Sequence, residues 1–446
     1  MSESDRPRAL VVGLGTSGVA ASALLARRGY RVTANDRRNE AELAASLSRL
    51  PEGVVAALGG HPARLLDDVD LVVASPGVPW ALPLLVEARR RRIETIAEVE
   101  LAARVVTGVP IVGVTGSNGK STVTTLIGEI LLAAGRRAGV GGNLGTAASE
   151  LALEGGWDAL VLELSSFQLE GCTTLRPRVA LLLNLSPDHL DRHPDMASYL
   201  AAKARIFACQ DGSDAAVLNA DDPAVRALEV PSRVSRFSLS DRRAEAHAEG
   251  GALVLDGRAL LPRAELPLLG DHNVANALAA ALAADRLGVG RDAIAAGLRS
   301  FKGLPHRHRI VAESRGVRWV DDSKGTNIGA TAAGLPGYPA GTIHLILGGL
   351  GKGQDFTDLR PAADGKLARV YLIGEAADEI GAALEGVAPI ERCGTLEEAV
   401  RRAAALAHPG DTVLLSPACA SFDQFRDYAH RGDEFARLAR ASAGVR

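Results

Sequence analysis

Two glycine-rich turns in this sequence have the residue types needed to hold phosphate groups. The first, GLGTSG at 13–18, follows an apolar run and opens a stretch rich in Ala and Leu. Small residues let the backbone approach a diphosphate, whose charge the amides of a helix N-terminus then meet. Asp36 follows at about the distance expected for a ribose-binding acid. The turn predicts a diphosphate site, with an unliganded strand-to-helix turn as the alternative.

The second turn, IVGVTGSNGKST at 111–122, has the parts of a nucleotide-binding P-loop. Backbone amides between Gly116 and Gly119 can surround phosphates, Lys120 can reach the terminal phosphate oxygens, and the Ser121 hydroxyl suits Mg²⁺. The loop is a variant, because Val114 occupies the position of the usual first glycine. It predicts ATP or GTP together with magnesium.

Carboxylate, imidazole and amine side chains follow apolar runs in the central part of the chain, at Glu163, Asp188, His189 and Lys203. In open α/β sheets ligands collect at the carboxyl ends of strands, so we expect Glu163 and His189 to face the same crevice as the P-loop. Mg²⁺ bound through one or two side chains and phosphate oxygens fits this set. For His189 alone, a structural histidine is an equally good interpretation.

Further cations stand beside Gly- and Ser-containing turns in the last third of the chain, at Arg307, Lys324 and Lys352. Such side chains are expected where a small anionic substrate or nucleotide phosphates are held. Each alone could be an ordinary surface residue. Together with the two phosphate-binding turns they indicate a third binding region.

The elements that must position these residues follow a simple alternation. Short β-branched or Leu-rich runs alternate with Ala-rich stretches of helical length, the pattern of parallel α/β sheets. The expected strands lie at 8–15, 31–37, 70–77 and 93–98 in a first group, at 110–117, 158–166, 179–186 and 215–222 in a second, and at 316–323, 342–349, 369–374 and 411–418 in a third. A polar, turn-rich stretch at 231–265 follows the second group. Domain boundaries are expected near 105 and 304.

Composition limits the classes of protein. The 446 residues weigh 46.3 kDa, and 47% apolar with 23% charged residues is typical of globular chains with several cores. The formal charge of −3 gives no reason to expect nucleic acid as a partner. No apolar run approaches the ~20 residues of a membrane span, and no signal peptide is evident. These features predict a cytoplasmic protein.

The order and spacing of the motifs resemble the Mur ligase family over nearly the whole chain. The residues that carry the resemblance are GLGTSG (13–18), ASPGV (74–78), VTGSNGKSTVTTL (114–126), GGNLG (141–145), LELSSFQLE (162–170), DHLDRH (188–193), HNVANALAA (272–280), LPHR (304–307), DSKGTN (322–327), LGGLGK (347–352) and LLSPACASFDQF (414–425).

The resemblance implies an α/β protein of three domains. A Rossmann-like N-terminal domain (1–105) would bind a UDP-sugar, a central P-loop ATPase-type domain (106–303) ATP, and a Rossmann-like C-terminal domain (304–446) an amino acid. The implied activity is an amide ligase that activates a carboxylate with ATP as an acyl phosphate. The GSN tripeptide before GKST and the SSFQLE run favour the member that adds D-glutamate to UDP-N-acetylmuramoyl-L-alanine in peptidoglycan precursor synthesis. Members that add L-alanine, a diamino acid or folate-linked glutamate are the alternatives.

The resemblance also implies roles for individual residues. The catalytic residues would be Lys120, His189 and Lys203. The ligands of two Mg²⁺ ions would be Ser121, Glu163, His189 and Lys203, with Lys203 carbamylated to offer an anionic oxygen. The ATP site would contain Gly116, Ser117, Asn118, Gly119, Lys120, Ser121, Thr122, Asn276, Arg307, Asp322 and Lys324. The UDP-sugar site would contain Gly15, Thr16, Asp36, Arg38, Ser75, Asn143 and Gln168. The D-glutamate site would contain Thr326, Lys352, Ser421 and Tyr428.

Two departures from the family pattern lie near these sites. His308 and Arg309 follow LPHR, where the family often has an apolar residue or Gln and then Glu, and Tyr428 replaces the commoner Phe.

The expected partners are small-molecule substrates only, and the expected state is a monomer. A nicotinamide dehydrogenase would leave the P-loop unexplained, whereas a P-loop NTPase switch would hydrolyse nucleotide without an amino acid.

Overall fold

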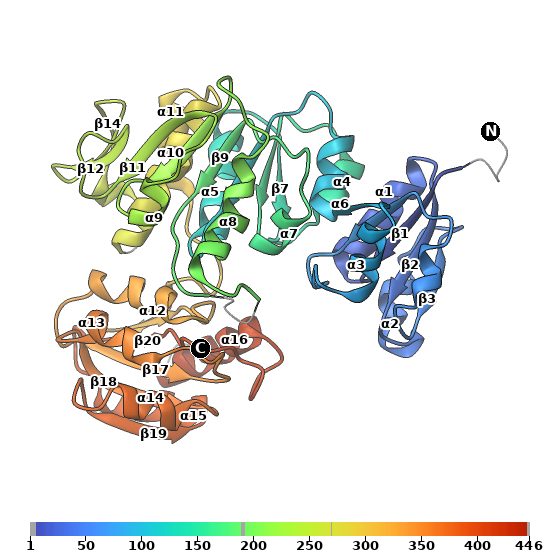
Figure 1. The fold of residues 1–446 in the computed structure, drawn as a ribbon. Helices are drawn as coiled ribbons and strands as arrows, with labels where there is room; N and C mark the ends of the chain where they lie inside the picture. The colour runs from blue at the N-terminus through green and yellow to red at the C-terminus, as the bar shows by residue number, and fades with distance from the viewer. Residues whose placement is uncertain (1–5, 189–191, 269, 444–446) are drawn as a thin grey trace. The chain divides into compact units, whose positions relative to one another are not determined.

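The computed structural model describes residues 6–188, 192–268 and 270–443. Within these residues the chain forms three α/β sheets, which follow one another along the chain from blue to red in Figure 1. The first two sheets belong to one compact unit, and the third sheet belongs to a second. The expected α/β fold is confirmed.

The first sheet has the strand order β3-β2-β1-β4-β5, with every neighbouring pair parallel. Its elements are β1 (Arg8–Val12), α1 (Thr16–Arg27), β2 (Arg31–Asp36), α2 (Glu40–Leu47), β3 (Val55–Leu58), the 3₁₀ helix η2 (Ala63–Leu66), β4 (Leu71–Ala74), α3 (Pro83–Arg90), β5 (Glu94–Ala97) and α4 (Glu98–Val105). The strand order reverses between β1 and β4, and ligands of open α/β sheets bind at such a point. The GLGTSG turn lies there, directly after β1.

The second sheet has the order β14-β13-β12-β11-β10-β9-β6-β8-β7, parallel except for the antiparallel pairs of β13. Its strands are β6 (Ile111–Thr115), β7 (Ala138–Gly142), β8 (Ala159–Glu163), β9 (Val179–Leu182), β10 (Ala215–Asn219), β11 (Arg233–Ser238), β12 (Ala246–Glu249), β13 (Ala252–Leu255) and β14 (Arg258–Pro262). Its helices are α5 (Lys120–Ala133), α6 (Ala148–Glu154), α7 (Ser166–Glu170), α8 (Met196–Ala204), η3 (Arg205–Phe207), α9 (Pro223–Arg226), η4 (Arg263–Glu265), α10 (Asp271–Arg286) and α11 (Arg291–Ser300).

The third sheet has the order β15-β16-β20-β17-β18-β19, with only β15 antiparallel to its neighbour among the described strands. Its strands are β15 (Arg309–Ser314), β16 (Val317–Asp321), β17 (Ile343–Gly348), β18 (Leu367–Ile373), β19 (Ile390–Gly394) and β20 (Thr412–Leu415). Its helices are α12 (Ile328–Gly334), η5 (Leu335–Gly337), η6 (Phe356–Leu359), α13 (Arg360–Ala363), α14 (Ala377–Ala383), α15 (Leu396–Leu406) and α16 (Tyr428–Ala443).

Burial on both faces explains the continuous apolar runs of the third sheet. Leu345 and Leu414 pack into one core cluster, whereas Ile346 and Val413 pack into another. Successive strand residues point to opposite faces, so a strand covered by helices on both sides needs apolar residues throughout. The apolar runs thus predicted the central strands correctly.

The polar, turn-rich stretch at 231–265 also contains the strands β11 to β14, which were not expected there. Polar residues interrupt these strands, since β11 reads RVSRFS and β12 AHAE. Strands β3, β7, β15 and β19 were also not expected.

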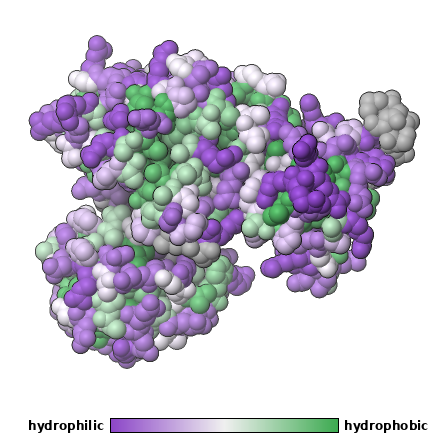
Figure 2. All heavy atoms as spheres, viewed as in Figure 1, coloured by the Kyte–Doolittle hydropathy of each residue, from purple (hydrophilic) through white to green (hydrophobic). Residues whose placement is uncertain are grey.

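Among the described residues, no helix combines the length and apolar character that a membrane crossing requires. On the face shown in Figure 2, hydrophilic residues cover much of the surface and hydrophobic ones lie among them.

A buried carboxyl group links α4 to α6. The Ser149 amide donates to Glu98 Oε1 at 2.5 Å, and Glu98 is 1% exposed. Its Oε2 is buried without a hydrogen-bond partner among the described residues. Burial raises the pKa of Glu98 to about 6, although the hydrogen bonds from Ser149 oppose the shift.

Glu98→Gln is expected to stabilise the protein relative to the parent, and this gain in the free energy of unfolding should be larger at neutral pH than at acidic pH. The folded state holds the Glu98 proton more tightly than the unfolded state, so this group costs stability progressively as pH rises from about 4.5 to above 6. The cost reaches about 2 kcal/mol. Urea unfolding at about pH 5 and about pH 7.5 measures it. The exposed Glu154→Gln, on α6, is the control, and an equal effect of Glu98→Gln at both pH values would refute the expectation.

Candidate active site

The GLGTSG turn leaves no room for a side chain at Gly18. A Cβ on Gly18 would lie 1.8 Å from the Gly13 carbonyl oxygen and 2.8 Å from Ser75 Oγ. Ser75, which follows β4, donates its hydroxyl to the same Gly13 carbonyl at 2.7 Å. The N-terminus of α1 therefore approaches β1 and β4 closely, and its first amides remain available to an anion.

Asp36, at the end of β2, is held by hydrogen bonds within the first sheet. Its Oδ2 accepts from the Leu14 amide at 2.8 Å and from Arg38 Nη2 at 2.8 Å, and its Oδ1 accepts from the Arg38 amide and Nε. Burial would raise the pKa of Asp36, but the hydrogen bonds from Arg38 and Leu14 outweigh it and keep the pKa well below its usual range. Asp36 stays ionised and orients the Arg38 guanidinium beside the turn.

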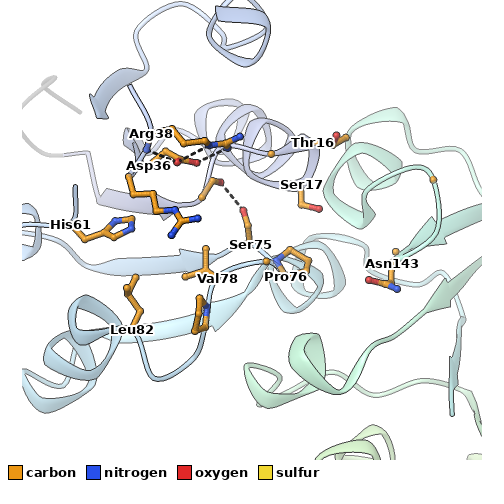
Figure 3. A pocket seen from close by; sticks show the side chains of 17 residues that line it. Thr16, Ser17, Asp36, Arg38, His61, Ser75, Pro76, Val78, Leu82 and Asn143 are labelled. Atoms are coloured by element: carbon orange, nitrogen blue, oxygen red, sulfur yellow. Dashed lines mark hydrogen bonds and ion pairs between the residues drawn. The ribbon is translucent and has the colours of Figure 1, made fainter. Parts of the chain in front are cut away.

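A pocket of about 690 Å³ lies at this turn. Of the expected UDP-sugar residues, it is lined by Gly15, Thr16, Asp36, Arg38, Ser75 and Asn143. Figure 3 shows Asn143 at one end of the pocket and His61 at the other, with Thr16 and Ser17 on its wall. Gln168 is not part of this lining. It forms a capping box with Ser165 at α7, and its buried Nε2 has no hydrogen-bond partner among the described residues.

Sequence reasoning missed several residues of this lining. They include Ser17, Arg37, His61, Val78 and Leu82. His61 follows β3, so the rule that ligands gather at the carboxyl ends of strands would have found it had β3 been recognised.

The P-loop joins β6 to α5, and its lysine forms hydrogen bonds with carbonyl groups of the loop itself. Lys120 Nζ donates to the Gly116 carbonyl at 2.9 Å and to the Ser117 carbonyl at 2.8 Å. Gly119 has φ +84, and a Cβ there would lie 2.4 Å from Asn276 Oδ1. The expected ATP residue Asn276, on α10, thus lies against the loop. The loop residues Ser117, Ser121 and Thr122 are buried.

Two side chains whose oxygens could bind a metal ion lie together at the start of α5. The Ser121 hydroxyl donates to Glu163 Oε2 at 2.5 Å, and both residues are buried. Asn143 Nδ2 donates to the other carboxylate oxygen, Glu163 Oε1, at 2.8 Å. Mg²⁺ prefers carboxylate and hydroxyl oxygens, so the chemistry of Ser121 and Glu163 fits this ion. Asn143 lines the pocket and also donates to Glu163, which accepts from Ser121 of the P-loop.

Lys203, on α8, also reaches the P-loop. It is 1% exposed, donates to the Gly116 carbonyl at 2.8 Å, and its Nζ lies 4.3 Å from the centre of the Tyr199 ring. The structure therefore brings Lys120, Ser121, Glu163 and Lys203 together around one loop. His189, expected as a catalytic and metal-binding residue, lies outside the described residues.

The second unit gathers the remaining expected ATP residues near the ends of β16 and β20. Asp322 accepts from Ser416 Oγ at 2.7 Å and from the His308 amide at 3.3 Å. The Lys324 amide donates to the His306 carbonyl at 3.1 Å, and the half-buried Arg307 is the next residue in the chain.

Two residues that depart from the family pattern lie in this same region. The His308 ring packs on Tyr338, and its Nδ1 lies 3.5 Å from Asp322 Oδ2. Lys324 Nζ lies 3.9 Å from the centre of the Tyr428 ring. Phe would offer the same ring face to this cation, so the Tyr428 substitution preserves the contact.

Three of the four expected D-glutamate residues lie on three neighbouring turns, and the fourth, Tyr428, begins α16. The turn after β16 carries Thr326, the turn after β17 carries the exposed Lys352, and the turn after β20 carries the buried Ser421. Leu350 and Ala420 exchange two backbone hydrogen bonds, at 2.9 and 3.0 Å, which join the second and third turns.

A buried arginine that sequence reasoning missed fastens these turns. Arg431, on α16, is 1% exposed. Its guanidinium donates to the carbonyls of Ser323, Gly348, Cys419 and Ala420 at 3.0–3.5 Å and to Ser323 Oγ at 3.0 Å. Burial lowers the pKa of Arg431 to about 10, so it remains protonated at neutral pH. We assign it a positioning role for the turns of the third sheet.

Comparisons with known proteins agree with this arrangement. The sequence matches the family descriptions "Mur ligase MurD-like, N-terminal domain" at 7–97, "Mur ligase middle domain" at 114–284 and "Mur ligase, glutamate ligase domain" at 306–419.

Two relatives are similar over almost their whole length. A UDP-N-acetylmuramoylalanine–D-glutamate ligase of Anaeromyxobacter dehalogenans is 51% identical, with 98% of each chain covered. A protein of the same name in Myxococcus xanthus is 48% identical, with 97% of this chain and 98% of that protein covered. The fold resembles that of UDP-N-acetylmuramate-alanine ligase from Thermotoga maritima, with a TM-score of 0.61 at 19% identity, covering 98% of this chain and 99% of that one. The chain belongs to the Mur ligase family.

Proposed function

We propose that this protein is an ATP-dependent amide ligase that joins D-glutamate to UDP-N-acetylmuramoyl-L-alanine, the activity in the names of its close relatives. The observation that carries the proposal is the position of Asn143. It lines the pocket at the diphosphate turn and donates to Glu163 beside the P-loop. A ligase needs this adjacency, because the substrate carboxylate must meet the terminal phosphate of ATP.

The reaction follows from the poor reactivity of a carboxylate in water. A carboxylate oxygen of the muramoyl-alanine attacks the γ-phosphorus of ATP, the bond to the bridging oxygen breaks, and ADP leaves. The neutral amine of D-glutamate then attacks the acyl carbon, phosphate leaves, and the nitrogen loses a proton. Lys120 and the amides at the start of α5 oppose the negative charge that gathers on the transferred phosphoryl group.

The donor set supports magnesium at this site. Ser121 and Glu163 would hold one ion, and we assign His189 and Lys203 to a second. Bound Mg²⁺ would neutralise phosphate charge. Lys203 as an ammonium would repel such an ion, so we propose that it reacts with carbon dioxide. The neutral amine forms the N–C bond, loses a proton, and becomes an anionic carbamate with oxygen ligands.

The carbamate on Lys203 is expected to appear in ¹³C NMR spectra of the protein equilibrated with ¹³C-bicarbonate. A carbamate resonance should be present in the parent and absent in Lys203→Arg. Lys366→Arg is the control, because Lys366 donates to the carbonyls of Pro336 and Tyr338 in the second unit. Identical spectra for the parent and Lys203→Arg would refute the modification.

We assign the substrates to the three domains in order. Residues 1–105 would bind the UDP-sugar and residues 106–303 the ATP phosphates. Residues 304–446 would contribute Arg307, Asp322 and Lys324 to ATP, and Thr326, Lys352, Ser421 and Tyr428 to D-glutamate. Gln168 and Asn143 would contact the sugar end of the nucleotide. We further propose that the protein works as a cytoplasmic monomer, for which light scattering after gel filtration tests the oligomeric state.

Phosphate release is expected only when ATP, Mg²⁺, UDP-N-acetylmuramoyl-L-alanine and D-glutamate are all present. The same assay with L-glutamate, L-alanine or meso-diaminopimelate in place of D-glutamate should release little phosphate. Release with one of these instead would keep the ligase chemistry and change the amino acid. Release without any amino acid would indicate a nucleotide hydrolase.

A further inference from the structure

The hydrogen bonds around His61 fix the position of its ring proton. His61 Nδ1 lies 2.6 Å from Asn35 Oδ1. The Asn35 amide nitrogen donates to the carbonyls of Ala57 at 2.7 Å and Gly60 at 2.8 Å, and the residue is fully buried. Because the Asn35 amide nitrogen donates to these two carbonyls, the amide oxygen faces His61, and this oxygen can only accept a hydrogen bond. The neutral ring must therefore carry its proton on Nδ1, which leaves a lone pair on Nε2.

This lone pair belongs to a pocket residue. His61 lines the pocket, and its ring points toward the side chains in the middle of it (Figure 3). The charged groups near the ring are Asp36, which favours protonation, and Arg37, which opposes it. Burial is the largest effect and lowers the pKa of His61 below its ordinary value. At neutral pH the ring presents an acceptor.

The ends of the pocket determine which part of the proposed substrate meets this acceptor. Asn143 marks the end beside the P-loop, where the reacting carboxylate must lie. The turn that suits the diphosphate carries Thr16, which lies between His61 and Asn143 and nearer to Asn143 (Figure 3). His61 stands at the opposite end, so the nucleobase is the part of the substrate that reaches it (Figure 3).

Resting on the proposed function, we infer that His61 selects the nucleobase of the substrate, with Nε2 accepting a hydrogen bond from the N3–H group of uracil. Cytosine has a lone pair at N3, so it would face His61 acceptor to acceptor. A polar group left without its partner on binding reduces affinity roughly 10- to 100-fold. His61 is thereby a specificity-determining residue.

Calorimetric titration of the full chain with UDP, CDP and N3-methyl-UDP tests this inference. The parent should bind UDP roughly 10- to 100-fold more tightly than the other two nucleotides. In His61→Phe, which keeps a planar ring without an acceptor, UDP should weaken and the UDP-to-CDP affinity ratio should fall toward one. Arg64→Ala, an exposed change on η2, should leave both the affinities and the ratio unchanged.

The pH dependence of the ratio separates recognition from packing. Protonation turns Nε2 into a donor, which suits cytosine. Because burial lowers the pKa of His61, the ratio should fall in the parent only as the pH drops below about 6.5, the ordinary pKa of histidine, and should stay constant in His61→Phe. The diphosphate group titrates equally in UDP and CDP, so its protonation does not change the UDP-to-CDP affinity ratio.

An unchanged ratio in His61→Phe, with equal losses for UDP and CDP, would overturn the inference and leave the proposed function standing. Failure of the parent to bind UDP at all would count against the proposed function itself, and against the inference with it.

Discussion

Lys120→Met is expected to lower kcat by at least about 10²- to 10³-fold, the loss typical of removing one group that stabilises transition-state charge. Lys120 is the cation of the P-loop, held by the carbonyls of Gly116 and Ser117 where the γ-phosphoryl group must lie. Methionine keeps most of the length of the side chain and removes its charge together with its two hydrogen bonds to the loop. Initial rates of phosphate release at saturating substrates measure the effect.

The control for Lys120→Met is Lys302→Met. Lys302 is exposed and follows α11 in the sequence. The activity of Lys302→Met should match that of the parent, and circular dichroism should show both variants folded. A Lys120→Met enzyme that retained more than about a tenth of the parental kcat would show that the P-loop charge is not used in catalysis.

Arg431→Met is expected to lower the free energy of unfolding of the third-sheet unit by about 3–5 kcal/mol. The substitution leaves the carbonyls of Ser323, Gly348, Cys419 and Ala420 without the charged donor that they share. The three turns that Arg431 joins carry the proposed D-glutamate residues Thr326, Lys352 and Ser421. The KM for D-glutamate should therefore rise at least about tenfold, and UDP binding in the first unit should be unchanged.

Arg437→Met, on the same helix, is the matched control, because Arg437 is exposed and pairs only with Glu434 among the described residues. It should change stability by less than about 0.5 kcal/mol. Urea unfolding and initial rates against D-glutamate measure both effects. If Arg431→Met does not fold well enough to assay, Arg431→Lys restores one donor and should raise the KM while the fold survives. A normal KM in a folded Arg431→Lys enzyme would mean that Arg431 serves stability alone.

The sequence predicted the central strands of all three sheets, because strands covered by helices must be apolar throughout. It did not predict β7, which reads AGVGG. A Cβ on Gly139 would lie 2.6 Å from the Leu160 side chain, so contacts with the neighbouring strand, rather than strand propensity, select the glycine. The polar strands β11 and β12 escaped prediction for a similar reason, since their place in the sheet depends on pairing with distant residues.

The residues of the candidate site also divide into those that the sequence could predict and those that it could not. Motifs of contiguous residues, such as the P-loop, could be recognised because one short segment supplies most of the contacts. Arg431 binds backbone carbonyls of three turns that are far from it in sequence, and carbonyls have no sequence signature. The role of His61 depends on Asn35 and on an unrecognised strand. Such residues become visible only when the fold brings the partners together.

The position of Asn143 predicts that the affinities of two ligands depend on each other. Its side chain lies in the wall of the pocket at the GLGTSG turn, where we propose that the nucleotide-sugar binds, and also donates to Glu163. Any ligand that shifts Asn143 alters the orientation of the carboxylate beside Ser121, and thermodynamic reciprocity requires an equal effect in the opposite direction. The expected consequence is that occupation of the pocket and occupation of the P-loop site each change the affinity of the other by the same factor.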